Sequence, residues 1–397
     1  MSQLIKNVWK KFDLAKEGKE VDYFFRFLKS EAIKYDLQKC VIINGVKSKF
    51  NKAVKNISNL NSNDNIVKIL SNWIQFSDLQ KDDVILSGII DTRKISCSLK
   101  AHLELRGVWH LVNEEIIVHD IPAEFERYIE RVVLDDDNRI PDKYYNSING
   151  KFMREEYRSL NSLIYKMSQK IVGNPTYRKG DLIIESTWNH DVVGSIVDYL
   201  LHNIKMCRNW DNGRVESTYT MRCKSKKGDF QGYIQSVADR SHNYEIVFGE
   251  TSYGPNHPNN LDHIYGDQVR LAKFGKISFE SIYNLFPRQD HKLLKNINIF
   301  IVQSHGYFLT LSIMDCKFLP FYRIRSIQNL HIPLETGPNS LEFIKKLAQT
   351  LYNYHLLVKE TVKHIDKIDV ELATRLGSVT PPNQIRTQTA IPIFETL

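Results

Sequence analysis

The pattern of apolar and polar positions is clearest from about residue 150 onward. Apolar residues recur at helical spacing over 154–171, and the segment that follows Glu185 shows the same period. Short runs rich in β-branched residues come next and predict three strands, over 215–223, 229–237 and 244–250. A second helical pattern over 262–285 follows them. This part of the chain is therefore expected to form a helix, three strands and a helix.

Strand-like patterns then return before a last long helix. The predicted strands cover 297–303, 307–314 and 318–327, and the predicted helix covers 340–367. The order helix, three strands, helix, strand predicts an α/β core. A fold of this class supports many activities, so function has to be argued from the residues of a site.

The N-terminal part of the chain has a different pattern. Val8, Phe12, Phe24 and Leu28 belong to a series of apolar residues at helical spacing within 1–60. Polar, turn-rich stretches at 56–64 and 135–141 mark possible boundaries. Three regions are expected: a mainly helical N-terminal domain of unknown role over 1–150, the α/β core over 151–376, and a flexible tail over 377–397.

Composition narrows the classes of function. Across 397 residues, 54 Lys and Arg face 46 Asp and Glu, which gives a net charge of +8. This surplus is consistent with a nucleic-acid partner but does not require one. The five cysteines include no C-x-x-C pair, which argues against a zinc ribbon or finger. No apolar run approaches the ~20 residues of a membrane helix, and no signal peptide is visible. We therefore expect no membrane partner and an intracellular protein of the nucleus or cytoplasm.

Two acidic residues stand at the ends of neighbouring predicted strands. Asp229 opens one strand and Glu250 closes the next. If these strands pair as a hairpin, both carboxylates lie at one end of the sheet. Two adjacent carboxylates repel each other unless a cation lies between them, and Mg²⁺ or Mn²⁺ prefers such oxygen ligands. The pattern predicts a metal site with carboxyl oxygens about 4–6 Å apart. The alternative is that each acid is an ordinary exposed charge at a strand end.

A third acid, Glu185, ends an apolar run before a predicted helix. Together with Lys227-Gly-Asp229-Phe and Phe248-Gly-Glu250-Thr, it makes residues 180–285 resemble the PD-(D/E)xK, or restriction-endonuclease-like, superfamily. The resemblance is closest to a group of uncharacterised fungal proteins with that core. It implies a mixed-sheet core flanked by helices, in which Glu185, Asp229 and Glu250 hold Mg²⁺ or Mn²⁺. It also implies a nuclease that hydrolyses DNA phosphodiester bonds.

One position departs from the superfamily pattern. A lysine usually stands two residues after the glutamate, and here that residue is Ser252. Some members carry the lysine on the following helix, where Lys273 is the candidate and Lys276 the alternative; Arg270 lies one turn earlier. The lysine supports the attacking water or offsets developing charge. These residues could also form a solvated basic face, because they fall away from the apolar stripe of the predicted helix.

A cluster of basic residues leads into Asp229. Its members are Arg214, Arg222, Lys224, Lys226 and Lys227. Cations beside an acidic site are what a phosphate backbone requires, and they predict a nucleic-acid-binding surface. A solvated hairpin turn is the competing interpretation.

Three hypotheses therefore follow from the sequence. The first is a Mg²⁺-dependent nuclease with DNA as its partner, RNA being the open alternative and a homodimer being possible. The second is a nucleic-acid-binding module that has lost its chemistry. The third is a protein-interaction or effector protein that uses the core as a scaffold. The sequence contains no P-loop, no G-x-G-x-x-G after a strand and no G-x-S-x-G. These absences argue against kinases, NAD enzymes and α/β-hydrolases.

Overall fold

The computed structural model of the chain describes residues 64–76, 84–134, 155–170, 177, 182–214, 227–239, 242–258, 261–285, 294–319, 321–333 and 338–377. The chain divides into two compact units. One comprises Met1–Ser87 with Phe394–Leu397, and the other comprises Gly88–Ile393.

The described part of the first unit is helical. It contains α3 (Asp64–Phe76) and the short 3-10 helix η1 (Val84–Ser87). In α3, Ile66, Leu70 and Trp73 are buried at intervals of three and four residues, as expected for one apolar stripe. The helices predicted within residues 1–60 lie outside the described residues.

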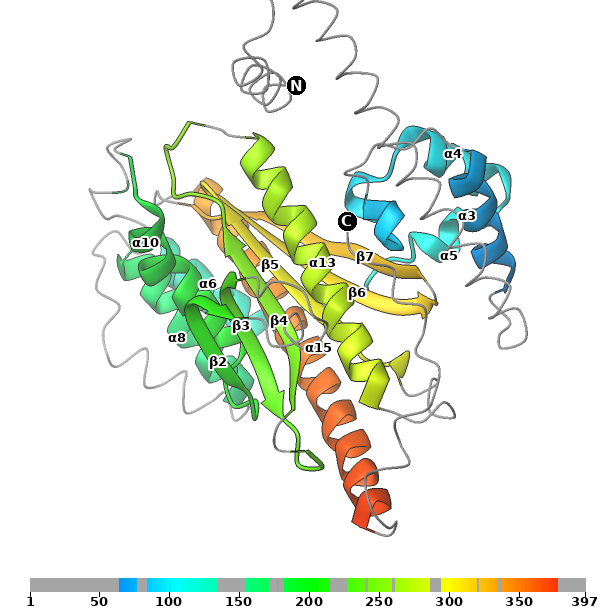
Figure 1. Ribbon diagram of the computed structural model, residues 1–397. Helices are drawn as coiled ribbons and strands as arrows, with labels where there is room; N and C mark the ends of the chain where they lie inside the picture. Colours follow the sequence, from blue (N-terminus) through cyan, green and yellow to red (C-terminus); the bar gives the residue numbers. More distant parts are fainter. Residues whose placement is uncertain are drawn as a thin grey trace, which may run out of the picture. The chain divides into compact units, whose positions relative to one another are not determined.

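The second unit is built on a mixed sheet, which the described residues form from seven strands (Figure 1). Its strands are β1 (Ile89–Asp91), β2 (Cys207–Arg214), β3 (Lys227–Gln235), β4 (Asn243–Thr251), β5 (Ile299–His305), β6 (Phe308–Phe318) and β7 (Phe321–His331). They lie side by side in the order β1-β7-β6-β5-β4-β3-β2. The pairs β1–β7 and β4–β5 are parallel, and the other neighbours are antiparallel.

The centre of the sheet is covered on both faces. Strand β5 has a nearly continuous buried run, which is typical of a strand with helices on either side. Helix α13 (Leu261–Leu285) joins β4 to its parallel neighbour β5 and packs on one face, where Phe274 contacts Phe248.

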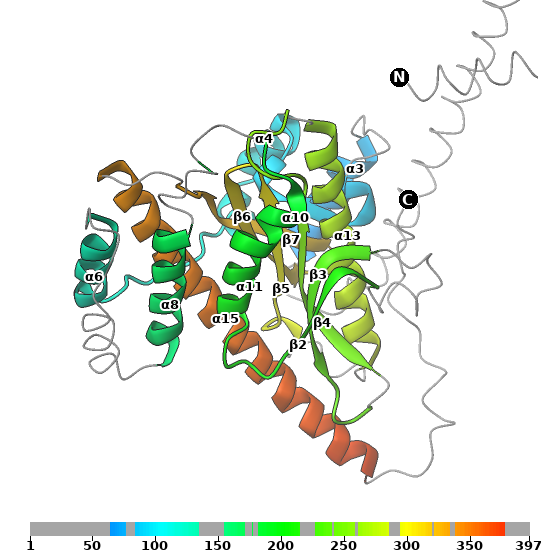
Figure 2. The same cartoon turned by 90° about the vertical axis from the view of Figure 1, so that its left-hand side faces the viewer.

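Helices α11 (Gly194–Leu200) and α15 (Pro338–Gly377) lie on the opposite face (Figure 2). The Tyr354 hydroxyl of α15 donates to the backbone carbonyls of Ile301 and Ser312 and so fixes α15 to β5 and β6. The described residues of this unit also form η2 (Thr92–Lys94), α4 (Cys97–Leu105), α5 (Trp109–Val112), α6 (Ala123–Leu134), α8 (Glu155–Lys170), α10 (Glu185–Trp188) and the π-helical turn η3 (Asn189–Val193).

The mixed α/β fold predicted from the sequence is confirmed. The observed β3, β4 and α13 begin and end within two residues of the predicted spans. The predicted strand over 215–223 lies outside the described residues, and the strand that pairs with β3 on the side away from β4 is Cys207–Arg214.

The described part of the chain contains no helix whose length and apolarity would let it cross a membrane. The predicted boundary near residue 150 and the predicted tail over 378–397 fall outside the described residues. Residues 88–134 belong to the same compact unit as the sheet, because β1 pairs with β7 and Lys345 of α15 contacts Glu130 of α6.

Candidate functional site

Asp229 and Glu250 lie at one end of the sheet, on the same face. Phe230 pairs with Gly249 in the β3–β4 ladder, so Asp229 and Glu250 are the next residues opposite each other. Residues directly opposite in an antiparallel pair point to the same side of the sheet. Their carboxyl groups are close enough for a side-chain hydrogen bond between them. This is also the carboxyl end of the parallel strands β4 and β5, where open α/β sheets commonly place ligands.

The backbone around these two acids is tightly packed. Oδ2 of Asp229 accepts a hydrogen bond of 2.6 Å from the Thr251 backbone N–H. A side chain at residue 249 is excluded, because a Cβ on Gly249 would lie 1.7 Å from the Phe230 ring. This close approach fixes the position of the residue immediately before Glu250.

Glu185 is brought to the same end of the sheet by the segment that precedes it. The Ile183 N–H donates to the Pro255 carbonyl over 3.1 Å, which ties residue 183 to the loop after β4. Gly254 permits this contact, because a Cβ there would lie 2.1 Å from the Ile183 carbonyl oxygen. One helical turn later, Trp188 Nε1 donates to Ser304 Oγ over 3.0 Å. Glu185 therefore begins α10 beside the end of β4.

The structure adds two residues that sequence reasoning did not place in the site, Asp267 and Arg270 of α13. Arg270 Nη1 lies 2.9 Å from Glu250 Oε1, and its Nη2 lies 3.3 Å from Asp267 Oδ1. Asp267 is buried and accepts a 2.8 Å hydrogen bond from Ser252 Oγ. The residue in the usual lysine position thus joins the carboxylate cluster through Asp267.

The site cluster is defined here as Glu185, Asp229, Glu250, Asp267 and Arg270. A sequence signal for its last two members exists: an acidic and a basic residue three apart, in the first turns of the helix that follows Glu250. Similar pairs occur on many helix surfaces, so this signal does not by itself distinguish a site from a surface ion pair.

The two candidate lysines have different positions. Lys273 is half-buried on α13, one turn beyond Arg270, and its role stays a prediction. Lys276 is fully buried and pairs with Glu280 at 3.5 Å. The interpretation of Lys276 as part of a solvated basic face is therefore wrong, because its side chain is buried and paired with Glu280. Its role as the alternative to Lys273 stays a prediction.

Burial and mutual repulsion raise the pKa values of the predicted acids. Burial, followed by the charge of Asp229, raises the pKa of Glu250 to about 8 even though Arg270 acts in the opposite direction. Burial also raises the pKa of Asp229, against the hydrogen bond from Thr251. The pKa of Glu185 is raised by burial and then by Asp229. The cluster therefore carries more carboxyl groups than its present positive charge can keep ionised.

The ligand types of the cluster suit a hard divalent cation. Carboxylate oxygens are the protein ligands that Mg²⁺ and Mn²⁺ prefer, and raised pKa values indicate a site that would gain from added positive charge. Among the described residues, however, no group of three or more His, Cys, Asp or Glu side chains is already arranged to hold a metal ion. Arg270 bridges Glu250 and Asp267, so a cation at Glu250 would require the guanidinium to move.

A cavity of about 710 Å³ adjoins the cluster. It is lined by Glu185, Ser252, Tyr253, His257, Pro258, Leu261, Asp262 and His263. His263 lies 3.6 Å from Asp267, one turn away on α13. Exposed apolar residues, Ile184 and Leu261, stand beside Glu185 and on the cavity wall. The cavity thus offers both polar and apolar surface next to the carboxylates.

The predicted basic cluster is only partly within the described residues. Arg214 pairs with Lys227 in the β2–β3 ladder, so the backbone of both lies two residues from Asp229, at the site end of the sheet. Their side chains, and the whole of Arg222, Lys224 and Lys226, lie outside the described residues. The predicted nucleic-acid-binding role of these five residues stays a prediction.

Comparison of the chain with known protein families, curated proteins and solved structures found no match. The resemblance to the PD-(D/E)xK superfamily therefore rests on the motif residues of this sequence.

Proposed function

We propose that this protein is a metal-dependent nuclease that hydrolyses phosphodiester bonds of DNA. The observation that carries the proposal is the convergence of Asp229, Glu250 and Glu185 at one end of the sheet. These residues come from three separate elements, and burial, followed by the charge of Asp229, raises the pKa values of Glu185 and Glu250. Carboxyl groups whose pKa values are shifted by burial and by a neighbouring charge are typical of functional sites.

Asp229 and Glu250 would hold Mg²⁺ or Mn²⁺, with Glu185 as the third carboxylate. When bound, the ion would supply positive charge at the scissile phosphate and a more acidic water. Arg270 would supply further positive charge. Its guanidinium pairs with buried Glu250 and is 41% exposed, so an ion at Glu250 would displace it toward solvent, where it can bind a phosphate.

The cavity beside the cluster suits a nucleotide better than a bare anion. Phosphate would lie toward Arg270 and the carboxylates, while the exposed apolar side chains of Ile184 and Leu261 offer contact surface to a sugar or base. His257 and His263 line the same cavity and can donate hydrogen bonds to phosphate oxygens.

A DNA-cleavage assay tests this proposal. Purified protein with Mg²⁺ or Mn²⁺ should cleave plasmid or oligonucleotide DNA, and Asp229→Asn should abolish cleavage because it removes a charged ligand with little change of shape. Arg270→Ala should lower the rate by about 10²–10³, the usual cost of losing one electrostatic contact to the transition state. The cleavage rate of Lys273→Ala, measured in parallel, shows whether Lys273 or Arg270 offsets the charge that develops at the phosphate.

The matched control is Asp120→Asn, at an exposed carboxylate that accepts a hydrogen bond from Gln349. It makes the same chemical change outside the cluster and should leave the rate unaltered. Cleavage that persists in Asp229→Asn would refute the proposed site. RNA substrates are included because the residues of the cluster do not distinguish the two polymers.

A binding module without catalysis is the second candidate. Ser252 stands where the superfamily carries lysine, and its hydroxyl is committed to buried Asp267. Binding of DNA with no cleavage, and no heat of Mn²⁺ binding by calorimetry, would favour this candidate over the nuclease.

A further inference from the structure

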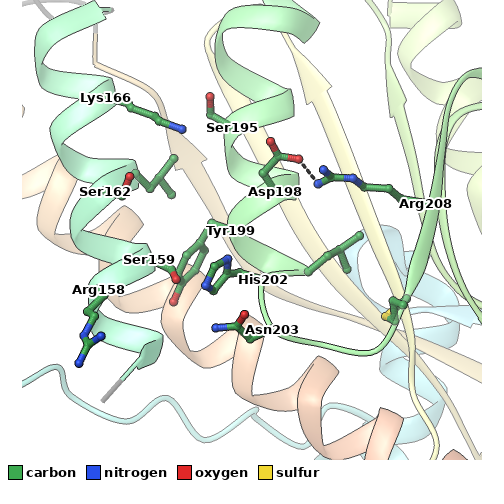
Figure 3. Close-up of a pocket in the computed structure, with 13 residues that line it drawn as sticks. Arg158, Ser159, Ser162, Lys166, Ser195, Asp198, Tyr199, His202, Asn203 and Arg208 are labelled. Atoms are coloured by element: carbon green, nitrogen blue, oxygen red, sulfur yellow. Dashed lines mark hydrogen bonds and ion pairs between the residues drawn. The ribbon is translucent and has the colours of Figure 1, made fainter. Parts of the chain in front are cut away.

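A second polar groove lies between α8 and α11 (Figure 3), and its lining includes no residue of the site cluster. Its volume is about 690 Å³. Its lining comprises Arg158, Ser159, Ser162, Leu163 and Lys166 of α8, Ser195, Asp198 and Tyr199 of α11, and the following turn and strand through Leu201, His202, Asn203, Met206 and Arg208. We call this the α8–α11 groove.

The charge of the α8–α11 groove is positive. Its one acid, Asp198, is already paired with Arg208. Arg158 and Lys166 are exposed, and neither has an ion-pair partner among the residues that the structure describes. Within the part of the chain that the structure describes, the groove thus has two cations without an ion-pair partner and no carboxylate without one, which favours an anionic ligand.

Hydrogen-bond donors accompany these cations. Lys166 on α8 and the Ser195 hydroxyl on α11 extend from opposite walls toward the space between them (Figure 3). Ser162 lies one turn from Lys166 on α8, and Asn203 follows α11 in a left-handed backbone conformation with φ of 53°. Cations combined with hydroxyl and amide donors match the several acceptor oxygens of a phosphate group, and an arginine can bind two of them at once.

The groove is connected to the site cluster by one continuous helical stretch, α10 through η3 to α11. Ser195 follows Glu185 by ten residues, and ten residues of helix span about 15 Å. Successive phosphates of one strand are about 3.4 Å apart along a duplex axis, so this separation corresponds to about four or five nucleotides. A single bound strand is thus long enough to reach both places.

We propose that the α8–α11 groove is a second nucleic-acid site, which binds phosphodiester groups of the strand whose reactive bond lies at the carboxylates. This proposal rests on the proposed function for its choice of polymer. It concerns binding only, and the residues that carry it are separate from Asp229, Glu250 and Glu185.

The test uses binding without metal, so that it is independent of cleavage. Anisotropy of a labelled 24-nucleotide DNA would be measured in EDTA with the full chain, in single-stranded and duplex form. Arg158→Gln combined with Lys166→Gln should weaken binding at least tenfold, because contacts from charged donors to phosphate are among the stronger hydrogen bonds. The slope of log Kd against log salt should fall by about two, one for each lost phosphate contact.

The matched control is Lys346→Gln combined with Lys363→Gln on α15. Both residues are exposed and lie outside the groove, and the pair removes the same total charge. This control variant should change the affinity for DNA less than about twofold if the groove itself, rather than the net positive charge of the protein, holds the DNA. Equal losses in the two double variants, or no loss in either, would overturn the proposal.

Two further measurements distinguish DNA from inorganic phosphate as the ligand of the groove. They also distinguish this inference from the proposed nuclease activity. Affinity should rise with oligonucleotide length up to about eight nucleotides in the wild type, and less so in the groove variant, if one strand spans both places. If the protein binds inorganic phosphate but not DNA, the proposal that a DNA strand is the ligand of the groove is wrong. Groove-dependent binding in a protein that neither cleaves DNA nor binds Mn²⁺ would retain this inference and reject the nuclease.

Discussion

At the residue scale, burial and charge act in opposite directions on Glu250. The side chain is 4% exposed and has Asp229 as a neighbour, and both effects disfavour its ionised form. Arg270 favours the ionised form through its contact at 2.9 Å. Because the pKa of Glu250 rises to about 8, burial and Asp229 outweigh Arg270. Burial likewise raises the pKa of Asp229, and the hydrogen bonds to Thr251 and Glu250 only oppose that rise.

Stability should therefore depend on pH through Glu250. A carboxyl whose pKa is raised on folding binds a proton in the native state that the unfolded state releases. Its contribution is present below the unfolded pKa of about 4.5 and is lost as pH rises toward about 8, by on the order of a few kcal/mol. In EDTA, the wild type should lose more stability between pH 5 and pH 8.5 than Glu250→Gln does.

Urea unfolding at several pH values measures this difference. Glu360→Gln is the control, because Glu360 is exposed on α15, where it lies 3.8 Å from His364. Parallel pH profiles for the wild type and Glu250→Gln would show that the native Glu250 carboxyl titrates as it does in the unfolded chain.

The residues of the candidate site were predictable from sequence in part. Asp229, Glu250 and Glu185 stand where apolar runs change to polar loops, and that position is visible in the sequence. Asp267 and Arg270 were not placed in the site, since a charged residue on a helix has many possible partners until packing selects one. Lys276 is the opposite case. Its spacing indicated a surface position, but pairing with Glu280 allows the side chain to be buried.

At the element scale, strands with apolar cores were predictable and polar edge strands were not. Strand β4 is buried along almost its whole length, and its sequence is rich in apolar residues. Strand β2, Cys207–Arg214, has the sequence CRNWDNGR and no apolar alternation. It forms because β3 offers a free edge to pair with, which is a property of the assembled sheet. Strand β1 has three residues, too few to show a period.

Gly254 connects two elements of the site and provides a test at this scale. A Cβ at this position would lie 2.1 Å from the Ile183 backbone oxygen, so Gly254→Ala must displace the segment that leads to Glu185. We expect a loss of about 1–3 kcal/mol in the free energy of unfolding, as for overpacking elsewhere. The rate of DNA cleavage by Gly254→Ala should fall by more than the fraction of folded protein does.

Gly266→Ala is the matched control. Gly266 lies within α13, and a Cβ there meets nothing within 4 Å. Alanine favours a helix over glycine, so this variant should gain about 0.5–1 kcal/mol and keep its activity. If Gly254→Ala is as stable and as active as Gly266→Ala, the contact between residues 183 and 254 does not position Glu185.

At the scale of the whole molecule, the order of elements was predictable but the extent of the sheet was not. Helix, three strands, helix and strand follow one another along the chain as expected, and the later strands extend the same sheet. Residues 88–134 add β1 and α6 to the same compact unit, although their sequence suggested part of a separate domain. Their contacts include β7 and α15, more than 200 residues away in sequence, as in the hydrogen bond from Asn353 Nδ2 to the His119 carbonyl. Pairing over such separations leaves no local pattern.

Charge is also a property of the whole molecule, and its net value of +8 includes two local concentrations. One is the α8–α11 groove, and the other is the predicted basic cluster that leads into Asp229.

Replacing Lys224, Lys226 and Lys227 together by Ala should lower the slope of log Kd against log salt by up to about three, because each phosphate contact contributes about one. Separate surfaces should act additively, so this triple combined with Arg158→Gln and Lys166→Gln should lower the slope by about five. Anisotropy titrations of the same DNA between about 50 and 300 mM salt give the slopes. A combined variant no weaker than the Lys224, Lys226 and Lys227 triple would mean that the groove does not touch the strand, and a slope unchanged in every variant would favour a protein-interaction role for this fold.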